Sequence, residues 1–281
     1  MAARLPRPDA AVVRDDVARA LREDVGSGDC TAALIPADRS LATRVVCRED
    51  AVLAGRAWFD ETFRQLDDGV RVDWSAEEGE RLQPDREVCR MRGPARAILT
   101  GERTALNFLQ TLSGTATRTR RYVDAIAGTG TVVLDTRKTL PGLRRAQKYA
   151  VLCGGGANHR IGLFDAVLIK ENHIAAAGTI RAAVRAAQAT RGDRLLEVEV
   201  ENIGQLGEAV AAGAQRVLLD NFPLAALREA AQLFADRVEL EASGGIELDT
   251  IRAVAETGVH FISTGDLTKS VRAVDFSMRF V

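Results

Sequence analysis

The sequence predicts an α/β protein whose larger, C-terminal part forms a β/α barrel or an incomplete barrel. After residue 128, short apolar runs alternate with stretches in which apolar residues recur at helical spacing. Nearly continuous apolar strands that alternate with helices are typical of a parallel sheet covered by helices. At least six such units, roughly 21–35 residues apart, favour a barrel over a doubly wound sheet. The predicted strands are 131–134, 166–169, 195–200, 216–219, 238–242 and 259–263, and the predicted helices between them include 178–190, 203–212, 223–235 and 247–257.

The first hundred residues show a mixed pattern. An amphipathic helix is predicted near 10–24, because Val13, Val17, Ala20 and Leu21 share one face. A second helix is predicted at 56–67, and strands are predicted at 43–47, 70–74, 86–91 and 95–99. Glycines then divide a long helical region, which predicts one helix from 101 that ends at Gly114 and another that ends at Gly128.

Bulk properties describe an ordinary globular protein of 281 residues. The net charge is −1 and the pI is near 6.4, which gives no support to nucleic-acid binding. The four cysteines form no C-x-x-C pair, so we expect reduced thiols in or near the core. No stretch approaches the length of a membrane span, and the first eleven residues lack the apolar region of a signal peptide. We therefore expect a cytoplasmic protein.

Positive charge is concentrated in residues 135–173. This segment is net +4, although the whole chain is net −1. Interleaved glycines and apolar runs argue against a solvated basic tail. A folded cluster of this kind is suited to a small, highly anionic substrate. Its cations are Arg137, Lys138, Arg144, Arg145, Lys148, Arg160 and Lys170.

Polar residues follow the predicted strands at their carboxyl ends, where α/β barrels build active sites. Glycine turns after the last two strands are typical of a phosphate site. Lys170 is suited either to a Schiff base or to phosphate binding, and Glu199 and Asp220 to ribose hydroxyls or Mg²⁺. Alternation does not decide among Glu197, Glu199 and Glu201. The strand-end residues are Thr136, Arg137, Lys138, Lys170, Glu199, Asp220, Ser243, Gly244, Gly245, Thr264 and Gly265.

Several motifs together resemble the quinolinate phosphoribosyltransferase family, also called carboxylating nicotinate-nucleotide pyrophosphorylases. They are ERTALNFLQTLSGTAT, DTRKTLPGLRRAQKYAV, GGGANHR, LIKENH, EVEVEN, LLDNF, EASGGI and ISTGDLTKSVRAVDFSMRF. The resemblance covers nearly the full length. It implies an N-terminal α/β sandwich (1–113, joined by 269–281), an incomplete β/α barrel (114–268), and a homodimer with shared active sites or a higher oligomer.

The resemblance also implies roles for residues. Arg137, His159 and Arg160 would bind quinolinate, and Arg103 would reach in from the partner subunit. Lys138 and Lys170 would contact the pyrophosphate or the carboxylates, and Glu199 and Asp220 would match ribose- and metal-associated acids. Mg²⁺ is expected to bind mainly through the pyrophosphate, with those two acids as candidate ligands. The phosphate loops would be Ser243, Gly244, Gly245, Thr264, Gly265 and Asp266, although an acid at 266 repels phosphate unless it turns away or caps a helix.

The implied reaction transfers phosphoribosyl from 5-phosphoribosyl 1-pyrophosphate to quinolinate with loss of CO₂, in de novo NAD biosynthesis. Three other interpretations of the sequence remain at this point. They are a related phosphoribosyltransferase with another base, an aldolase-type lyase that uses Lys170 as a nucleophile, and a non-enzymatic ligand sensor. We also expect the apolar face of helix 101–113 (Leu106, Phe108, Leu109 and Leu112) to dock on a partner subunit.

Overall fold

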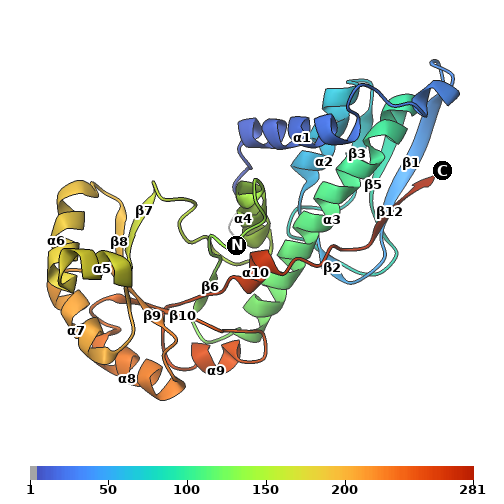
Figure 1. Ribbon diagram of the computed structural model, residues 1–281. Coiled ribbons are helices and arrows are strands. Elements are labelled where there is room, and N and C mark those ends of the chain that lie inside the picture. Colours follow the sequence, from blue (N-terminus) through green and yellow to red (C-terminus); the bar gives the residue numbers. More distant parts are fainter. Residues whose placement is uncertain (1–4) are drawn as a thin grey trace. The chain divides into compact units, whose positions relative to one another are not determined.

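The computed structural model describes residues 5–281 (Figure 1). Residues 1–4, part of the predicted N-terminal domain, lie outside the described residues. The chain divides into two units. Unit 1 holds the described residues up to Arg120 together with Leu140–Gly155 and Ser270–Val281, and unit 2 holds Arg121–Thr139 and Gly156–Lys269. Residues 140–155, which we predicted to belong to the barrel, thus group with unit 1.

Unit 1 is built on a four-stranded antiparallel sheet with the order β12-β1-β5-β3. The C-terminal strand pairs with β1, so the end of the chain completes this sheet. The short strands β2 and β4 pair separately. The elements are α1 (Ala10–Asp24), a 3-10 turn (Ala32–Leu34), β1 (Ser40–Cys47), β2 (Ala51–Val52), α2 (Arg56–Leu66), β3 (Arg71–Trp74), β4 (Arg81–Leu82), β5 (Arg86–Pro94), α3 (Ala95–Ala125, in this unit to Arg120), α4 (Arg144–Cys153) and β12 (Phe276–Phe280).

Helix α3 supplies apolar side chains to both hydrophobic cores of unit 1. Leu106 and Leu109 pack in the core that covers the sheet, and Phe108 and Leu112 pack in the core that holds α1 and α4. All four are at most 8% exposed. The expectation that this face docks on a partner subunit is therefore wrong, because the unit's own core covers it.

Helix α3 also corrects two boundaries. The strand predicted at 95–99 is its first turn, and the helix continues through Gly114 for 31 residues. Gly114 serves close packing rather than termination. A Cβ atom built there would lie 2.2 Å from the carbonyl oxygen of Arg272, in the segment that leads to β12. Glycine is the residue that allows a backbone to approach a helix so closely.

Unit 2 contains a six-stranded parallel sheet with the order β6-β11-β10-β9-β8-β7. The first two strands along the chain, β6 and β7, form its two edges and do not pair, so the barrel is incomplete. All six predicted strands are confirmed within one or two residues. The elements are β6 (Val132–Leu134), β7 (Ala166–Ile169), α5 (Glu171–Ala177), α6 (Ile180–Thr190), β8 (Leu195–Val200), α7 (Ile203–Ala212), β9 (Arg216–Asp220), α8 (Leu224–Phe234), β10 (Glu239–Ser243), α9 (Ile251–Ala255), β11 (Phe261–Ser263) and α10 (Asp266–Lys269).

Helices α6 to α9 lie outside the strands of unit 2, each against the strand that follows it in the chain (Figure 1). Local signals explain their bounds. The Asn202 side chain accepts a hydrogen bond from the backbone N–H of Gln205, which starts α7, and Gly213 ends it at φ +94°. Because the sheet is parallel, the carboxyl ends of all six strands meet at one edge.

Three of the four cysteines lie in the core as predicted, and Cys30 does not. Cys47, Cys89 and Cys153 are buried, Cys30 is exposed, and none forms a disulfide. Among residues 5–281, no helix has the length and apolar character needed to cross a membrane.

The packing of Gly114 yields a stability prediction. Alanine normally stabilises a helix interior by about 1 kcal/mol relative to glycine. At position 114 we expect Gly114→Ala to lower the free energy of unfolding by about 1–3 kcal/mol, because its Cβ would overlap the Arg272 carbonyl. Urea unfolding measures the change. Gly207→Ala is the matched control, since its Cβ would meet only an ordinary contact at 3.9 Å and should be neutral or stabilising. Equal effects of the two substitutions would contradict the packing role of Gly114.

Candidate active site

A cavity of about 280 Å³ opens at the carboxyl ends of the parallel strands of unit 2. Nine of the predicted strand-end and loop residues line it: Thr136, Arg137, Lys138, His159, Arg160, Lys170, Glu199, Asp220 and Ser243. The other lining residues are Leu168, Leu218, Glu241 and Ser263. Four cations and three acids thus share one small space.

The turn after β6 holds Arg137 and Lys138 by local hydrogen bonds. The Thr136 hydroxyl accepts the backbone N–H of Lys138 at 3.0 Å, and the Lys138 carbonyl accepts the Thr268 hydroxyl at 2.8 Å. The aliphatic stem of Lys138 lies against Gly265, where a Cβ atom would come within 2.8 Å of Lys138 Cδ. Gly265 therefore leaves room for this lysine at the cavity.

Arg160 is held near another arginine. Its guanidinium donates to the Ala166 carbonyl at 3.4 Å, and the loop after it is closed by Asp165, which accepts the backbone N–H groups of Ile161 and Gly162. Burial, and next the positive charge of Arg137, lower the pKa of Arg160. Neighbouring cations of this kind favour the binding of an anion between them.

Lys170 and Glu199 form an ion pair across the cavity, from the ends of β7 and from β8. An amine paired in this way is an ammonium, whereas Schiff-base formation needs the free amine. Asp220, at the end of β9, accepts a hydrogen bond from the Asn221 side chain at 2.9 Å. Asn221 in turn leaves no space for a side chain at Gly244, whose Cβ would lie 2.2 Å from Asn221 Oδ1.

Of the predicted phosphate-loop residues, only Ser243 lines the cavity; Ser263, which was not predicted, lines it just before the second loop. Gly244 and Gly245 have φ values of +100° and +58°, which explains the glycine pair. The Thr264 hydroxyl donates to the Ile246 carbonyl at 3.0 Å and so joins the two loops. Gly244, Gly245, Thr264, Gly265 and Asp266 are not among the residues that line the cavity.

Asp266 does not line the cavity. Its carboxylate accepts a hydrogen bond from the Tyr122 hydroxyl, and it is the first residue of α10. An acid at a helix N-terminus is favourable. These two contacts account for an acid at this position.

The structure separates the three glutamates of β8 and its end. Glu199 lines the cavity, Glu201 is exposed beyond the strand, and Glu197 is fully buried one layer below Glu199. This layering follows from strand geometry, because residues two apart point to the same face.

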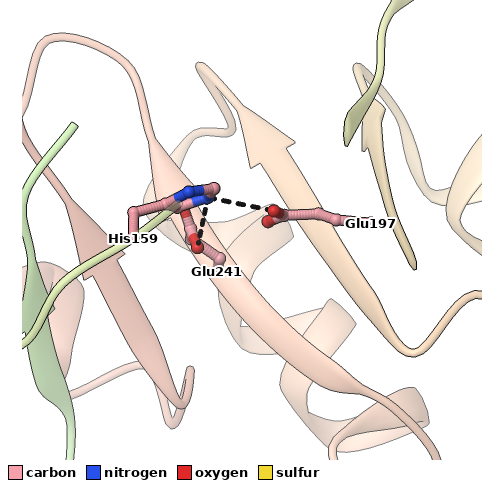
Figure 2. A group of neighbouring side chains, drawn as sticks. All are labelled: His159, Glu197 and Glu241. Carbon is pink, nitrogen blue, oxygen red and sulfur yellow. Dashed lines mark ion pairs between the residues drawn. The ribbon is translucent and has the colours of Figure 1, made fainter. Parts of the chain in front are cut away.

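At the base of the cavity, Glu197 and Glu241 meet His159 (Figure 2). His159 Nε2 lies 2.9 Å from Glu197 Oε2 and 3.5 Å from Glu241 Oε2, and both carboxylates are fully buried. Burial raises the pKa of both carboxyl groups, and the neighbouring Glu197 raises that of Glu241 further. The pattern did not predict Glu241. Its signal was an acid between the apolar Leu240 and Ala242 in a strand of a parallel sheet, where both faces are buried.

Two groups of residues have the donor atoms for a metal ion. His159, Glu197 and Glu241 offer atoms within 4.8 Å of one another. Glu199 and Asp220 offer carboxylates at the cavity surface, which suits a hard cation that arrives with a phosphorylated substrate.

The basic cluster of the sequence is divided in the structure. Arg137, Lys138, Arg160 and Lys170 line the cavity, whereas the other three cations lie on α4 in unit 1, where Lys148 is buried and Arg145 pairs with Asp9 at 3.6 Å. Arg103 also belongs to unit 1. Its side chain is exposed and forms no hydrogen bond or ion pair with residues 5–281.

Comparison with known proteins agrees with this geometry. Residues 29–113 match the family model for the quinolinate phosphoribosyl transferase N-terminal domain, and residues 115–279 match that for the C-terminal domain. The nicotinate-nucleotide pyrophosphorylase [carboxylating] of Mycobacterium leprae is 44% identical over 274 residues, which cover 94% of this chain and 96% of the relative. The probable enzyme of the same name from Bacillus subtilis is 43% identical over 257 residues, covering 91% and 89%. The solved nicotinate-nucleotide pyrophosphorylase of Francisella tularensis superposes with a TM-score of 0.94 at 42% identity, covering 99% of both chains. The chain belongs to the quinolinate phosphoribosyltransferase family.

Proposed function

We propose that this protein transfers phosphoribosyl from 5-phosphoribosyl 1-pyrophosphate to quinolinate and releases pyrophosphate and CO₂, giving nicotinate mononucleotide. The observation that carries the proposal is the cavity in which Arg137, Lys138, Arg160 and Lys170 surround Glu199 and Asp220. Its cations suit the two carboxylates of quinolinate, and its acids suit ribose hydroxyls. Family membership supplies the reaction, which belongs to NAD biosynthesis.

Quinolinate is assigned to the side of the cavity that holds Arg137, His159 and Arg160. Two guanidinium groups bind carboxylates with directional, charge-assisted hydrogen bonds. Lys170, already paired with Glu199, can turn toward a substrate carboxylate because its side chain is 45% exposed. This arrangement distinguishes a dicarboxylate from a monocarboxylate.

The phosphoribosyl donor is assigned to the opposite strand ends. Glu199 and Asp220 would hold the ribose, and Ser243 would contact the 5-phosphate from the cavity lining. The backbone N–H groups of the adjoining glycine loops would contribute if the phosphate reaches past this lining. Lys138 would face the pyrophosphate. Mg²⁺, bound with the pyrophosphate and beside Glu199 and Asp220, would neutralise the charge of the leaving group.

The residues then act by positioning and by electrostatics. The pyridine nitrogen attacks ribose C1 as the C1–O bond to pyrophosphate breaks, through an oxocarbenium-like state. The pyridinium that forms accepts the electron pair of the C2–CO₂⁻ bond, and a proton replaces the lost CO₂. No covalent enzyme intermediate is needed, which is consistent with the Lys170–Glu199 ion pair.

We also propose a cytoplasmic homodimer with shared sites. The support is Arg103, an exposed arginine without a partner among the described residues, on the helix that the family places at the neighbouring site. The apolar face of the same helix is not part of this argument, since it is buried in unit 1.

Base specificity tests the reaction most simply. We expect formation of nicotinate mononucleotide from quinolinate with Mg²⁺, and about tenfold to a hundredfold lower kcat/KM with nicotinate, because a lost charge-assisted contact costs about 1.5–3 kcal/mol. Pyrophosphate release measures both rates. Comparable kcat/KM for the two bases would refute the assignment, and no turnover of either base would favour a relative with another base or a ligand sensor.

Substitution of Lys170 distinguishes the transferase hypothesis from the lyase hypothesis. We expect Lys170→Arg to retain part of the activity and Lys170→Met to lose about tenfold to a hundredfold, because only the charge is needed. Borohydride added with substrate should leave no adduct by mass spectrometry. A reduced adduct at Lys170 would instead show that Lys170 forms a Schiff base, as the lyase hypothesis requires.

Subunit complementation tests the role of Arg103. We expect Arg103→Ala and Arg137→Ala proteins each to be nearly inactive. After subunit exchange, an equal mixture should recover about a quarter of wild-type activity, because half of the dimers are mixed and each has one intact site. Arg185→Ala, on the exposed face of α6, is the control and should be fully active. No recovery after demonstrated exchange would place Arg103 outside the neighbour's site.

A further inference from the structure

His159 uses both ring nitrogens inside the protein. Nδ1 accepts the backbone N–H of Arg160 at 2.7 Å, and Nε2 faces Glu197 and Glu241 at 2.9 and 3.5 Å (Figure 2). The backbone N–H of His159 is also held, by Asp135 at 2.9 Å. The ring is only 8% exposed. Both ring nitrogens are therefore already engaged within the protein.

These contacts define one protonation form of the ring. A nitrogen that accepts an N–H carries no hydrogen, so the proton of neutral His159 lies on Nε2. The imidazolium would point an Nδ1–H at the Arg160 N–H. The neutral ring with Nε2–H toward the carboxylates can accept the Arg160 N–H at Nδ1 and present its own N–H to Glu197 and Glu241 at Nε2.

The same geometry disfavours a metal ion in this cluster. A metal on Nε2 would require the proton to move to Nδ1, where the Arg160 N–H already points. The Arg216 guanidinium, 3.7 Å from Glu241 Oε2, already supplies a positive charge. The side-chain oxygens of Glu197 and Glu241 have no well-aligned hydrogen bond among the described residues, and their polar neighbours are His159 Nε2, the Arg216 guanidinium, each other and Ser263.

We propose that Glu197 and Glu241 are positioning residues for His159: they face its Nε2–H, hold the ring as the neutral tautomer, and so fix the backbone of Arg160. The ring orientation and the Arg160 backbone are coupled through the Nδ1 contact. If the ring turns, the contact between Nδ1 and the backbone N–H of Arg160 is lost. Arg160, which we assign to quinolinate binding, is then no longer held in place. Carboxylates behind a functional histidine play this orienting part in other sites.

The kinetic consequence rests on the proposed function and is specific to one substrate. Glu197→Met removes the nearer acceptor, and we expect the KM for quinolinate to rise about tenfold or more, as for loss of a buried polar partner. The KM for 5-phosphoribosyl 1-pyrophosphate should change less than about twofold. Glu197→Gln, whose amide oxygen can still face Nε2–H, should stay within about threefold of wild type. Equal rises for both substrates, or no rescue by glutamine, would overturn the positioning role.

Glu239→Gln is the matched control, since Glu239 lies two residues from Glu241 on the same strand and pairs with Arg216 near its surface. It should leave both KM values unchanged. A change as large as that of Glu197→Met would mean that Arg216, not the buried carboxylates, controls the site.

The closing experiment does not depend on turnover. In ¹⁵N-histidine-labelled protein, the His159 signals, identified by their loss in His159→Gln, should show a protonated Nε2 and an unprotonated Nδ1 between pH 6 and 9. In Glu197→Met this single-tautomer pattern should be lost, while Glu239→Gln keeps it. A protonated Nδ1 in wild type, an unchanged ring in Glu197→Met, or stoichiometric metal in the purified protein would each overturn the proposal. A correct ring without quinolinate turnover would instead refute the proposed function alone.

Discussion

The mutual repulsion of four cations in one small cavity is the constraint on which this site depends. Arg137, Lys138, Arg160 and Lys170 share about 280 Å³ with the acids Glu199, Asp220 and Glu241, and Lys170 pairs with Glu199. Burial, and next the charge of Arg137, lower the pKa of Arg160, although nearby acids oppose this shift. The carboxylates and phosphates of the proposed substrates would add negative charge beside these cations. Binding would thus relieve part of the cost of holding them together.

Parallel strands solve the problem of holding these groups together. Each strand is anchored by its helix and by its neighbours, so the residue at its carboxyl end has a fixed place. Alternation along β8 places Glu199 at the cavity and Glu197 one layer below it, and Glu241 of β10 lies level with Glu199. Glu197 and Glu241 support His159 and, through its ring, Arg160. The residues assigned to substrate contact and the residues that hold them in place thus come from the same strands.

Much of unit 2 could be predicted from the sequence because its strands are apolar on both faces and end in polar residues. The failures have physical causes. We predicted that the helix ends at Gly114. Instead the helix continues, and Gly114 allows the Arg272 carbonyl, 158 residues away in sequence, to approach it closely. The apolar face of α3 cannot be assigned to core or partner without its tertiary neighbours. The basic segment looked like one cluster, but residues 140–155 belong to unit 1. Glu241 was missed because pattern alone does not show which histidine lies opposite a buried acid.

The most direct measurement of the central claim is the thermal stability of Arg160→Met with and without quinolinate. Methionine keeps much of the side-chain volume and removes the charge. If the cation is held at a cost for the sake of an anion, the ligand-free variant should melt at the same temperature as wild type or higher, and quinolinate should no longer raise its Tm. A ligand-free Tm well below wild type together with an undiminished quinolinate shift would show that Arg160 serves the fold and not the substrate.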